Sequence, residues 1–207
     1  TGIYNGFAYS GGSWTPSTPD GTTGGSDAVI LDGTVILSSN TSLNDVIVHP
    51  GAGLQVDSGI TLTTNSVTLK STSTNYSSLI LNGSVSGTVR YERFVNSNSG
   101  GNDLISPPLN NETWSDFINA ANNNNAAMLL DDGNMSPTTY AFAPFDKTAI
   151  PADYVNYTSS TSATLINGLG YRAATVSGAV LTFNGNPQNG TISVGIENSG
   201  SGFAEWN

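Results

Sequence analysis

Short apolar runs return at a nearly fixed interval between residues 28 and 89, and this repetition limits the possible folds more than any other feature of the chain. Equivalent runs are separated by steps of 18 to 25 residues that are rich in Gly, Asn, Asp and Ser. Three sets of runs can be aligned: 28–30 with 46–48 and 67–69, 35–37 with 54–56 and 79–81, and 60–62 with 85–87. A repeat of this length predicts stacked rungs that bury their apolar faces only against one another.

The residues within each repeat favour short strands. The apolar runs are rich in β-branched residues, and inward and outward positions alternate in runs such as Leu79-Ile80-Leu81. Pro50-Gly51 and Asn82-Gly83 mark turns between them. We therefore predict an all-β protein in which residues 28–89 form a short parallel β-solenoid. An antiparallel β-sandwich is the alternative, because regularly spaced short strands with turn signals also describe that fold.

The sequence pattern changes near residue 90, which predicts three parts. These are an N-terminal cap or strand segment at 1–27, the solenoid rungs at 28–89, and an antiparallel, sandwich-like β region at 90–207. In the third part, strand-like runs are at 126–130, 138–143, 154–158, 163–166, 170–175, 179–183 and 191–196. The turn at 184–190 is expected to join the last two runs as a hairpin.

One short helix is expected near residues 112–122. Trp114, Phe117, Ile118 and Ala121 recur at the i, i+3, i+4, i+7 spacing of a single apolar helix face. Asn111 comes just before them and is the expected N-cap.

Composition limits the chemistry that the chain can perform. Ser, Thr, Asn and Gly occupy 99 of the 207 positions, whereas there is one His, no Cys and only five Lys and Arg. Cysteine-based metal sites and thiol chemistry are excluded, and few groups are left for acid–base relays. His49 precedes a turn and is expected at the surface. We therefore predict a protein that is not an enzyme, with no catalytic residues.

Two groups of residues are candidates for binding sites. Asp131, Asp132 and Asn134 form the densest cluster of oxygen ligands and could hold Ca²⁺, although they lack the spacing of an EF-hand loop. Trp14 and Tyr140 are candidate ligand-binding aromatics, because exposed rings provide stacking platforms for sugars. The segment 168–173 matches G-x-G-x-x-A, but no helix is expected after it, so no organic cofactor is predicted.

Charge and hydropathy narrow the range of partners. The formal net charge is −10, and the five basic residues are scattered along the chain, so there is no basic stripe for nucleic acid. No run of 18 or more apolar residues occurs, so no membrane span is expected.

Several segments together resemble a known class of proteins. They are 33–86, GTVRYERFV at 87–95, LISPP at 104–108, GYRA at 170–173, LTFNG at 181–185 and FAEWN at 203–207. This pattern is similar to that of large Bacteroidetes cell-surface proteins exported by the type IX secretion system. In such proteins the block continues into a C-terminal sorting domain, so we expect this sequence to be a fragment. The resemblance implies an extracellular or cell-surface location, adhesive or structural roles and contact with the secretion machinery.

These observations lead to a functional hypothesis with two alternatives. The first is a non-catalytic segment of a secreted bacterial surface protein, either a structural spacer or an adhesin, with surface glycans as possible partners. The second is a carbohydrate-binding module. The third is a polysaccharide-degrading β-helix enzyme, which is disfavoured by the scarcity of Arg and Lys that could stabilise a developing anion.

Overall fold

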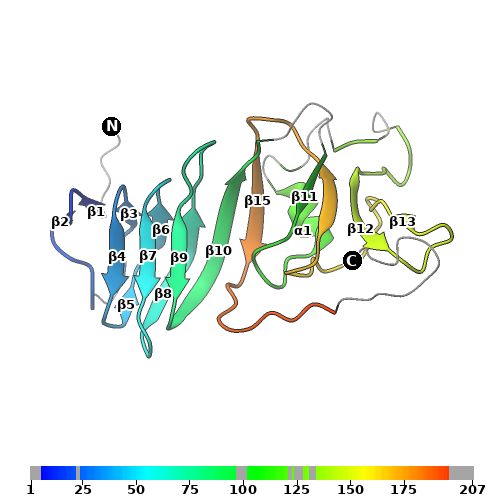
Figure 1. Ribbon diagram of the computed structural model, residues 1–207. Coiled ribbons are helices and arrows are strands. Elements are labelled where there is room, and N and C mark those ends of the chain that lie inside the picture. Colours follow the sequence, from blue (N-terminus) through cyan, green and yellow to red (C-terminus); the bar gives the residue numbers. More distant parts are fainter. Residues whose placement is uncertain are drawn as a thin grey trace. The chain divides into compact units, whose positions relative to one another are not determined.

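The computed structural model describes residues 6–21, 24–96, 102–120, 123, 128–130 and 134–195. The fold is mostly β, with a parallel β-solenoid of about four turns and an antiparallel sheet (Figure 1). This confirms the predicted fold class. The chain divides into two compact units. Unit 1 contains Thr1–Phe94 and Phe183–Asn189, and unit 2 contains Val95–Thr182 and Gly190–Asn207.

Unit 1 is built from two sheets of short, mostly parallel strands. The longer sheet has the order β15-β10-β8-β6-β3-β1-β2, with β5 also paired to β8, and the shorter sheet has the order β4-β7-β9. The strands of the longer sheet are β1 (Phe7–Ser10), β2 (Ser13–Thr15), β3 (Ala28–Ile30), β5 (Thr41–Ser42), β6 (Asp45–Val48), β8 (Thr61–Leu69), β10 (Ser84–Phe94) and β15 (Val180–Gly185), which enters unit 1 at Phe183. Those of the shorter sheet are β4 (Thr34–Leu37), β7 (Gly53–Val56) and β9 (Ser78–Leu81).

Two of the three alignments predicted from the repeats are confirmed by the strand register. In the first set, Val46 lies between Ala28 and Val67 in neighbouring parallel strands. The second set pairs in the same way through β4, β7 and β9. The inward side chains with no exposed surface are Val48, Val56, Leu62, Val67 and Val89. Because apolar residues stack on apolar residues, each rung covers the open face of its neighbour.

The third predicted alignment is wrong by two residues. Val85 pairs with Leu62, not with Ile60. Ile60 is apolar, but it ends a turn, and β8 begins one residue later. Pairing Leu62 with Val85 places two apolar side chains on the same face of neighbouring strands.

A glycine bulge follows this pair. The register between β8 and β10 shifts between Ser86 and Thr88, and Gly87 lies at the shift with φ +152°. A Cβ atom at this position would overlap the carbonyl oxygen of Thr64. The close approach of two backbones therefore requires glycine here.

Unit 2 contains an antiparallel sheet and a short helix. The sheet order is β11-β14-β12-β13. Its strands are β11 (Asn102–Ile105), β14 (Tyr171–Ala174), β12 (Phe142–Asp146) and β13 (Asp153–Tyr154), and the helix is α1 (Trp114–Asn119).

The predicted helix face is buried, but the predicted cap is wrong. Trp114, Phe117 and Ile118 are buried as expected, while Ala121 lies outside the described residues. The N-cap is Thr113, whose hydroxyl accepts a hydrogen bond from the backbone N–H of Asp116 at 3.1 Å. Asn111 has φ +68°, a left-handed conformation, whereas Thr113 has the extended backbone that an N-cap requires.

Several strand predictions for unit 2 also need correction. β12 begins at Phe142, not at 138, and 163–166 contributes only a single bridge, between Thr164 and Thr113. Residues 191–195 form no strand, so the predicted hairpin is wrong. Ile192 and Val194 are exposed, so this segment has no apolar face that is buried against a sheet. β15, the other strand of the predicted hairpin, pairs instead with β10 in the solenoid sheet.

Candidate functional site

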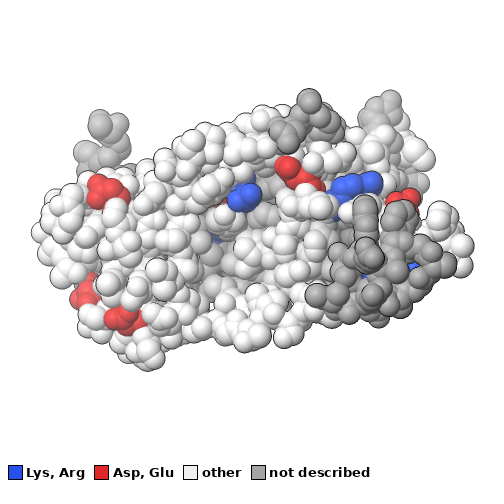
Figure 2. All heavy atoms as spheres, viewed as in Figure 1, with Lys and Arg blue, Asp and Glu red and all other residues white. Residues whose placement is uncertain are grey.

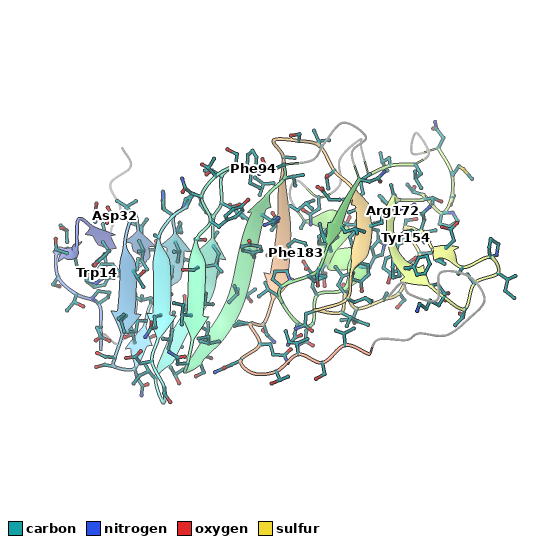
Figure 3. The ribbon with its side chains drawn as sticks, viewed as in Figure 1. Trp14, Asp32, Phe94, Tyr154, Arg172 and Phe183 are labelled. Atoms are coloured by element: carbon teal, nitrogen blue, oxygen red, sulfur yellow. The ribbon has the colours of Figure 1, made fainter. Side chains whose placement is uncertain are left out.

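Three acidic side chains of unit 1 hold neighbouring rungs together. Asp20 accepts a hydrogen bond from the backbone N–H of Ser39 at 2.9 Å, and Asp32 accepts one from the backbone N–H of Gly11, also at 2.9 Å. Asp45 accepts from a serine hydroxyl of the next rung at 2.6 Å. Such charge-assisted bonds fix loop geometry. These carboxylates therefore have structural partners in neighbouring strands and turns, and Asp32 is labelled in Figure 3.

Two acidic side chains of unit 2 also accept hydrogen bonds from threonines. Asp103 accepts a hydrogen bond from the hydroxyl of Thr175 at 2.8 Å. Asp146 accepts from both the hydroxyl and the backbone N–H of Thr148, and these bonds hold the pKa of Asp146 below its usual value. On the face drawn in Figure 2, charged atoms are sparse and most of the surface is neutral.

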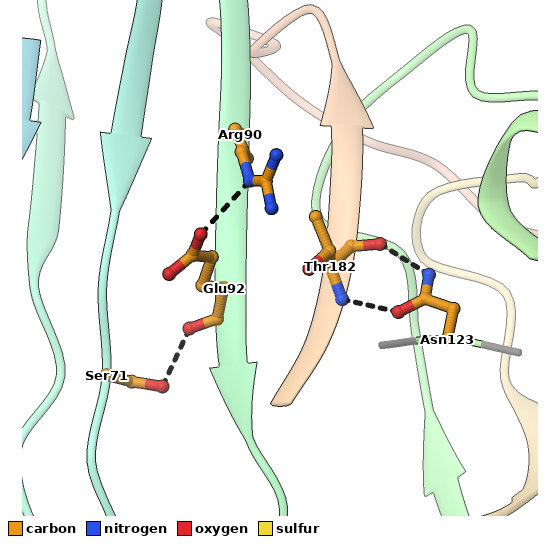
Figure 4. Close-up of polar contacts among 5 residues, drawn as sticks. All are labelled: Ser71, Arg90, Glu92, Asn123 and Thr182. Carbon is orange, nitrogen blue, oxygen red and sulfur yellow. Dashed lines mark hydrogen bonds and ion pairs between the residues drawn. The ribbon is translucent and has the colours of Figure 1, made fainter. Parts of the chain in front are cut away.

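One ion pair lies on the outer face of β10. Arg90 Nε is 3.1 Å from Glu92 Oε1 (Figure 4). Beside it, the hydroxyl of Ser71 donates to the backbone oxygen of Glu92 at 2.7 Å and accepts from the backbone N–H of Phe94 at 2.6 Å. These bonds attach the loop after β8 to the end of β10, so this group of charged and polar residues has a structural role.

His49, the one imidazole of the chain, is half-buried just after β6. Burial lowers its pKa, and the charge of Lys70 lowers it further. The imidazole is therefore neutral at pH 7. Its backbone N–H donates to the carbonyl of Ile30 at 2.9 Å, which adds to the pairing of adjacent rungs.

Trp14, one of the two candidate platform residues, closes the N-terminal end of the solenoid interior. Its ring meets Tyr9 at 5.3 Å and Phe7 at 6.5 Å, both in edge-to-face geometry. Together with Pro19 it lines a small gap of about 10 Å³ above the buried core residues of the first rungs. Packing of this kind uses the ring as a cap for the core.

Tyr140, the other candidate platform residue, is buried in the core of unit 2. Its ring lies 5.4 Å from that of Trp114, which in turn stacks on Phe142 at 4.9 Å. Tyr157 and Tyr171 complete this aromatic cluster. The exposed sugar platform expected at Tyr140 is therefore not formed, because the residue is needed inside the core.

A polar hollow of about 430 Å³ lies beside the start of α1. It is lined by Thr113, Ser115, Thr161, Ser162, Ala163 and Thr164. The Thr113 hydroxyl already caps the helix, and the Thr161 hydroxyl accepts from the backbone N–H of Thr158 at 2.8 Å. The lining residues offer hydroxyl groups but no charged or aromatic side chain, so the hollow has no group for proton transfer near neutral pH.

The candidate calcium site falls mostly outside the part of the chain that the structure describes. Asp131 and Asp132 are not among the described residues, and Asn134 is exposed. Among the residues that are described, no three His, Asp or Glu side chains come close enough to hold a metal ion.

Two tyrosines of the aromatic cluster, the buried Tyr171 and the half-buried Tyr157, provide a pH-dependent feature of unit 2. Burial, together with the electrostatic effect of Tyr171 and a hydrogen bond with it, raises the pKa of Tyr157 to about 12. Burial also raises the pKa of Tyr171, whose hydroxyl oxygen accepts a hydrogen bond from the backbone N–H of Ile166 at 3.0 Å. Tyrosine in an unfolded chain ionises near pH 10.

We expect the folding stability to fall as the pH rises from about 10 to about 12. In this window the unfolded state loses the Tyr157 proton more readily than the folded state does. The stability that the protonated Tyr157 contributes is therefore complete below pH 10 and is lost as the pH rises through the folded pKa of about 12. Urea unfolding at a series of pH values measures the slope. Tyr157→Phe should flatten it, and the half-exposed control Tyr76→Phe should not; equal slopes in all three proteins would contradict the assignment.

Within the described ranges, no helix has the length and apolarity needed to cross a bilayer. Comparison with protein-family models, with curated proteins and with solved structures found no match to this chain.

Proposed function

We propose that the chain is a non-catalytic segment of an extracellular bacterial surface protein and serves as a spacer or adhesive element. The observation that carries the proposal is that three carboxylates of unit 1 accept hydrogen bonds from residues far away in the sequence. Asp20, Asp32 and Asp45 each bond to a residue 18 or more positions away, so they hold the rungs in place. A stack of rungs held by such turns is a rigid element that displays a long outer face.

The outer face of the shorter sheet supports the adhesive part of this proposal. Ile36, Gln55 and Ile80 occupy equivalent positions in β4, β7 and β9 and form one row across the three strands. Ile36 is 53% exposed and Ile80 is 44% exposed. Exposed apolar side chains that repeat in register provide contact area for a partner at the surface.

Export by the type IX secretion system is part of the proposal and is supported by the sequence resemblance. It can be tested with antibodies raised against the purified chain. We expect them to label intact cells of the source organism and to lose this label in a strain without the secretion machinery. Labelling that requires cell lysis would show that the location is wrong.

The absence of catalysis needs its own measurement. The purified chain should release no reducing or unsaturated ends from a panel of neutral and acidic polysaccharides. Turnover that exceeds the background and is lost in Asp20→Asn or Asp103→Asn would establish an enzyme instead. Asp57→Asn is the matched control for a change of charge, because the Asp57 carboxylate accepts a hydrogen bond from Gln55, only two residues away.

A further inference from the structure

Arg172 is held on the outer face of the antiparallel sheet in unit 2. It lies in the central strand β14, between the buried residues Tyr171 and Ala173, so its side chain points away from the aromatic core. Across the two neighbouring strands it pairs with Leu104 of β11 and Ala143 of β12. Leu104 is 74% exposed, which leaves this part of the sheet open beside the guanidinium.

Two side chains fix the orientation of the guanidinium. Arg172 Cζ lies 4.7 Å from the centroid of the Tyr154 ring, a cation–π geometry, and Nη2 donates to Asn156 Oδ1 at 2.8 Å. The Tyr154 ring is itself held by edge-to-face contact with Phe145 at 5.2 Å. Figure 3 shows Arg172 and Tyr154 side by side. The arrangement is therefore rigid without a ligand.

The positive charge of Arg172 has no carboxylate partner in the described part of the chain. The ion pair found there joins Arg90 to Glu92 in unit 1. Asp103 is bonded to Thr175, and because it precedes Leu104 in β11 it points to the opposite face of the sheet. Asp153 accepts from the backbone N–H of Tyr154. A guanidinium with five donors thus uses one of them, on a neutral amide.

One of the remaining donors is also buried. Arg172 Nε has no exposed surface and no hydrogen-bond partner. A buried, unsatisfied donor on a charged group is costly and calls for an explanation. An anion at the guanidinium would offset the desolvation of this charge even if it bonded only to the accessible edge.

The neighbouring amide narrows the class of ligand. Because Asn156 Oδ1 accepts from Arg172, the Nδ2 group is oriented as a second donor. The site thus offers a planar cation and an amide donor next to exposed apolar surface. A carboxylate matches the guanidinium fork, and a sugar ring supplies hydroxyl acceptors and an apolar C–H face.

We propose that Arg172, Asn156 and Leu104 form a binding site for a uronate residue of an acidic glycan. The carboxylate binds the guanidinium edge, Asn156 Nδ2 donates to a ring or hydroxyl oxygen, and Leu104 covers the C–H face. In a chain with net charge −10, binding of an acidic ligand needs a local cation of this kind. This proposal rests on the adhesive role proposed above and gives that role a ligand class. If the site does not bind uronate, the proposed spacer role is unaffected.

The test is titration of the full chain with an oligogalacturonate and with the matching neutral galactose oligomer, followed by NMR or calorimetry. We expect saturable binding of the acidic oligomer only. Arg172→Gln should weaken it at least about tenfold, and Arg172→Lys should weaken it less, because lysine keeps the charge but loses the planar fork. Asn156→Ala should weaken it while leaving the cation in place.

Arg90→Gln is the matched control, because it removes a guanidinium that already has a carboxylate partner. It should leave binding unchanged, and a circular dichroism spectrum of each variant verifies the fold. The proposal is overturned by a lack of binding, by equal binding of the neutral oligomer, or by binding that survives Arg172→Gln. Binding of an acidic peptide without binding of the oligogalacturonate would also overturn it.

Discussion

Replacing Trp114 with alanine should lower the free energy of unfolding of unit 2 by about 3–5 kcal/mol, the range for large aromatic side chains in a core. The side chain is 1% exposed and its ring contacts four others: Phe117, Tyr140, Phe142 and Tyr157. Its indole N–H also donates to the backbone oxygen of Thr158 at 2.8 Å. The substitution therefore removes both the centre of the cluster and the partner of a carbonyl group.

Two further variants separate these contributions in calorimetry or chemical denaturation. Trp114→Phe keeps most of the ring packing but leaves the Thr158 carbonyl without the indole donor, so its effect should be intermediate. Ile150→Ala removes a large apolar side chain that is fully exposed, and it should change stability by less than about 0.5 kcal/mol. If Trp114→Ala were no more destabilising than Ile150→Ala, the aromatic cluster would not be the core of unit 2.

The solenoid could be predicted from sequence because its physical rule is local and repeated. Each rung must place apolar residues inward between turns, so equivalent residues, such as Val46 and Val67, recur at similar positions between turn signals. The rule failed at Ile60, where an apolar residue belongs to a turn. Apolar character alone cannot locate the first residue of a strand, and the Gly87 bulge depends on how closely two backbones approach.

The functional candidates were less predictable, because burial of an aromatic residue depends on tertiary packing. Tyr140 begins the continuous apolar run 140–143, and all four residues are buried. Such a run in the sequence could have indicated a core position. The Arg172 site had no sequence signal. Its partners Tyr154 and Asn156 come from a separate segment, and the pairing of β12 with both β13 and β14 brings that segment to β14.

Asn123, like Trp114, is expected to make a large contribution to the stability of unit 2. The sequence could not identify it, because it lies in a run of four asparagines at 122–125. Its amide is fully buried and pairs in both directions with Thr182: Nδ2 donates to the backbone oxygen, and Oδ1 accepts from the backbone N–H, each at 2.7 Å (Figure 4). Nδ2 also donates to the backbone oxygen of Phe117 at 2.7 Å. One side chain thus joins the end of α1 to β15.

Asn123→Asp should therefore destabilise unit 2 by about 3–5 kcal/mol at pH 7, a cost typical of an uncompensated buried charge. The new carboxylate would face two carbonyl oxygens, Phe117 O and Thr182 O, with no proton to donate. Burial and these oxygens raise its pKa in the folded state, so the variant should recover stability as the pH falls and the carboxyl becomes protonated.

The pH dependence distinguishes charge from shape. Asn123→Ala leaves the same oxygens without a donor but adds no charge, so its destabilisation should be the same at pH 4 and pH 7. Asn134→Asp places the same charge at an exposed position of unit 2 and should have little effect at either pH. Urea unfolding of the three variants at both pH values makes the comparison. If Asn123→Asp lost the same amount of stability at pH 4 and pH 7, the amide would act by its shape alone. A charge effect must depend on pH, because only the ionised carboxylate repels the two carbonyl oxygens.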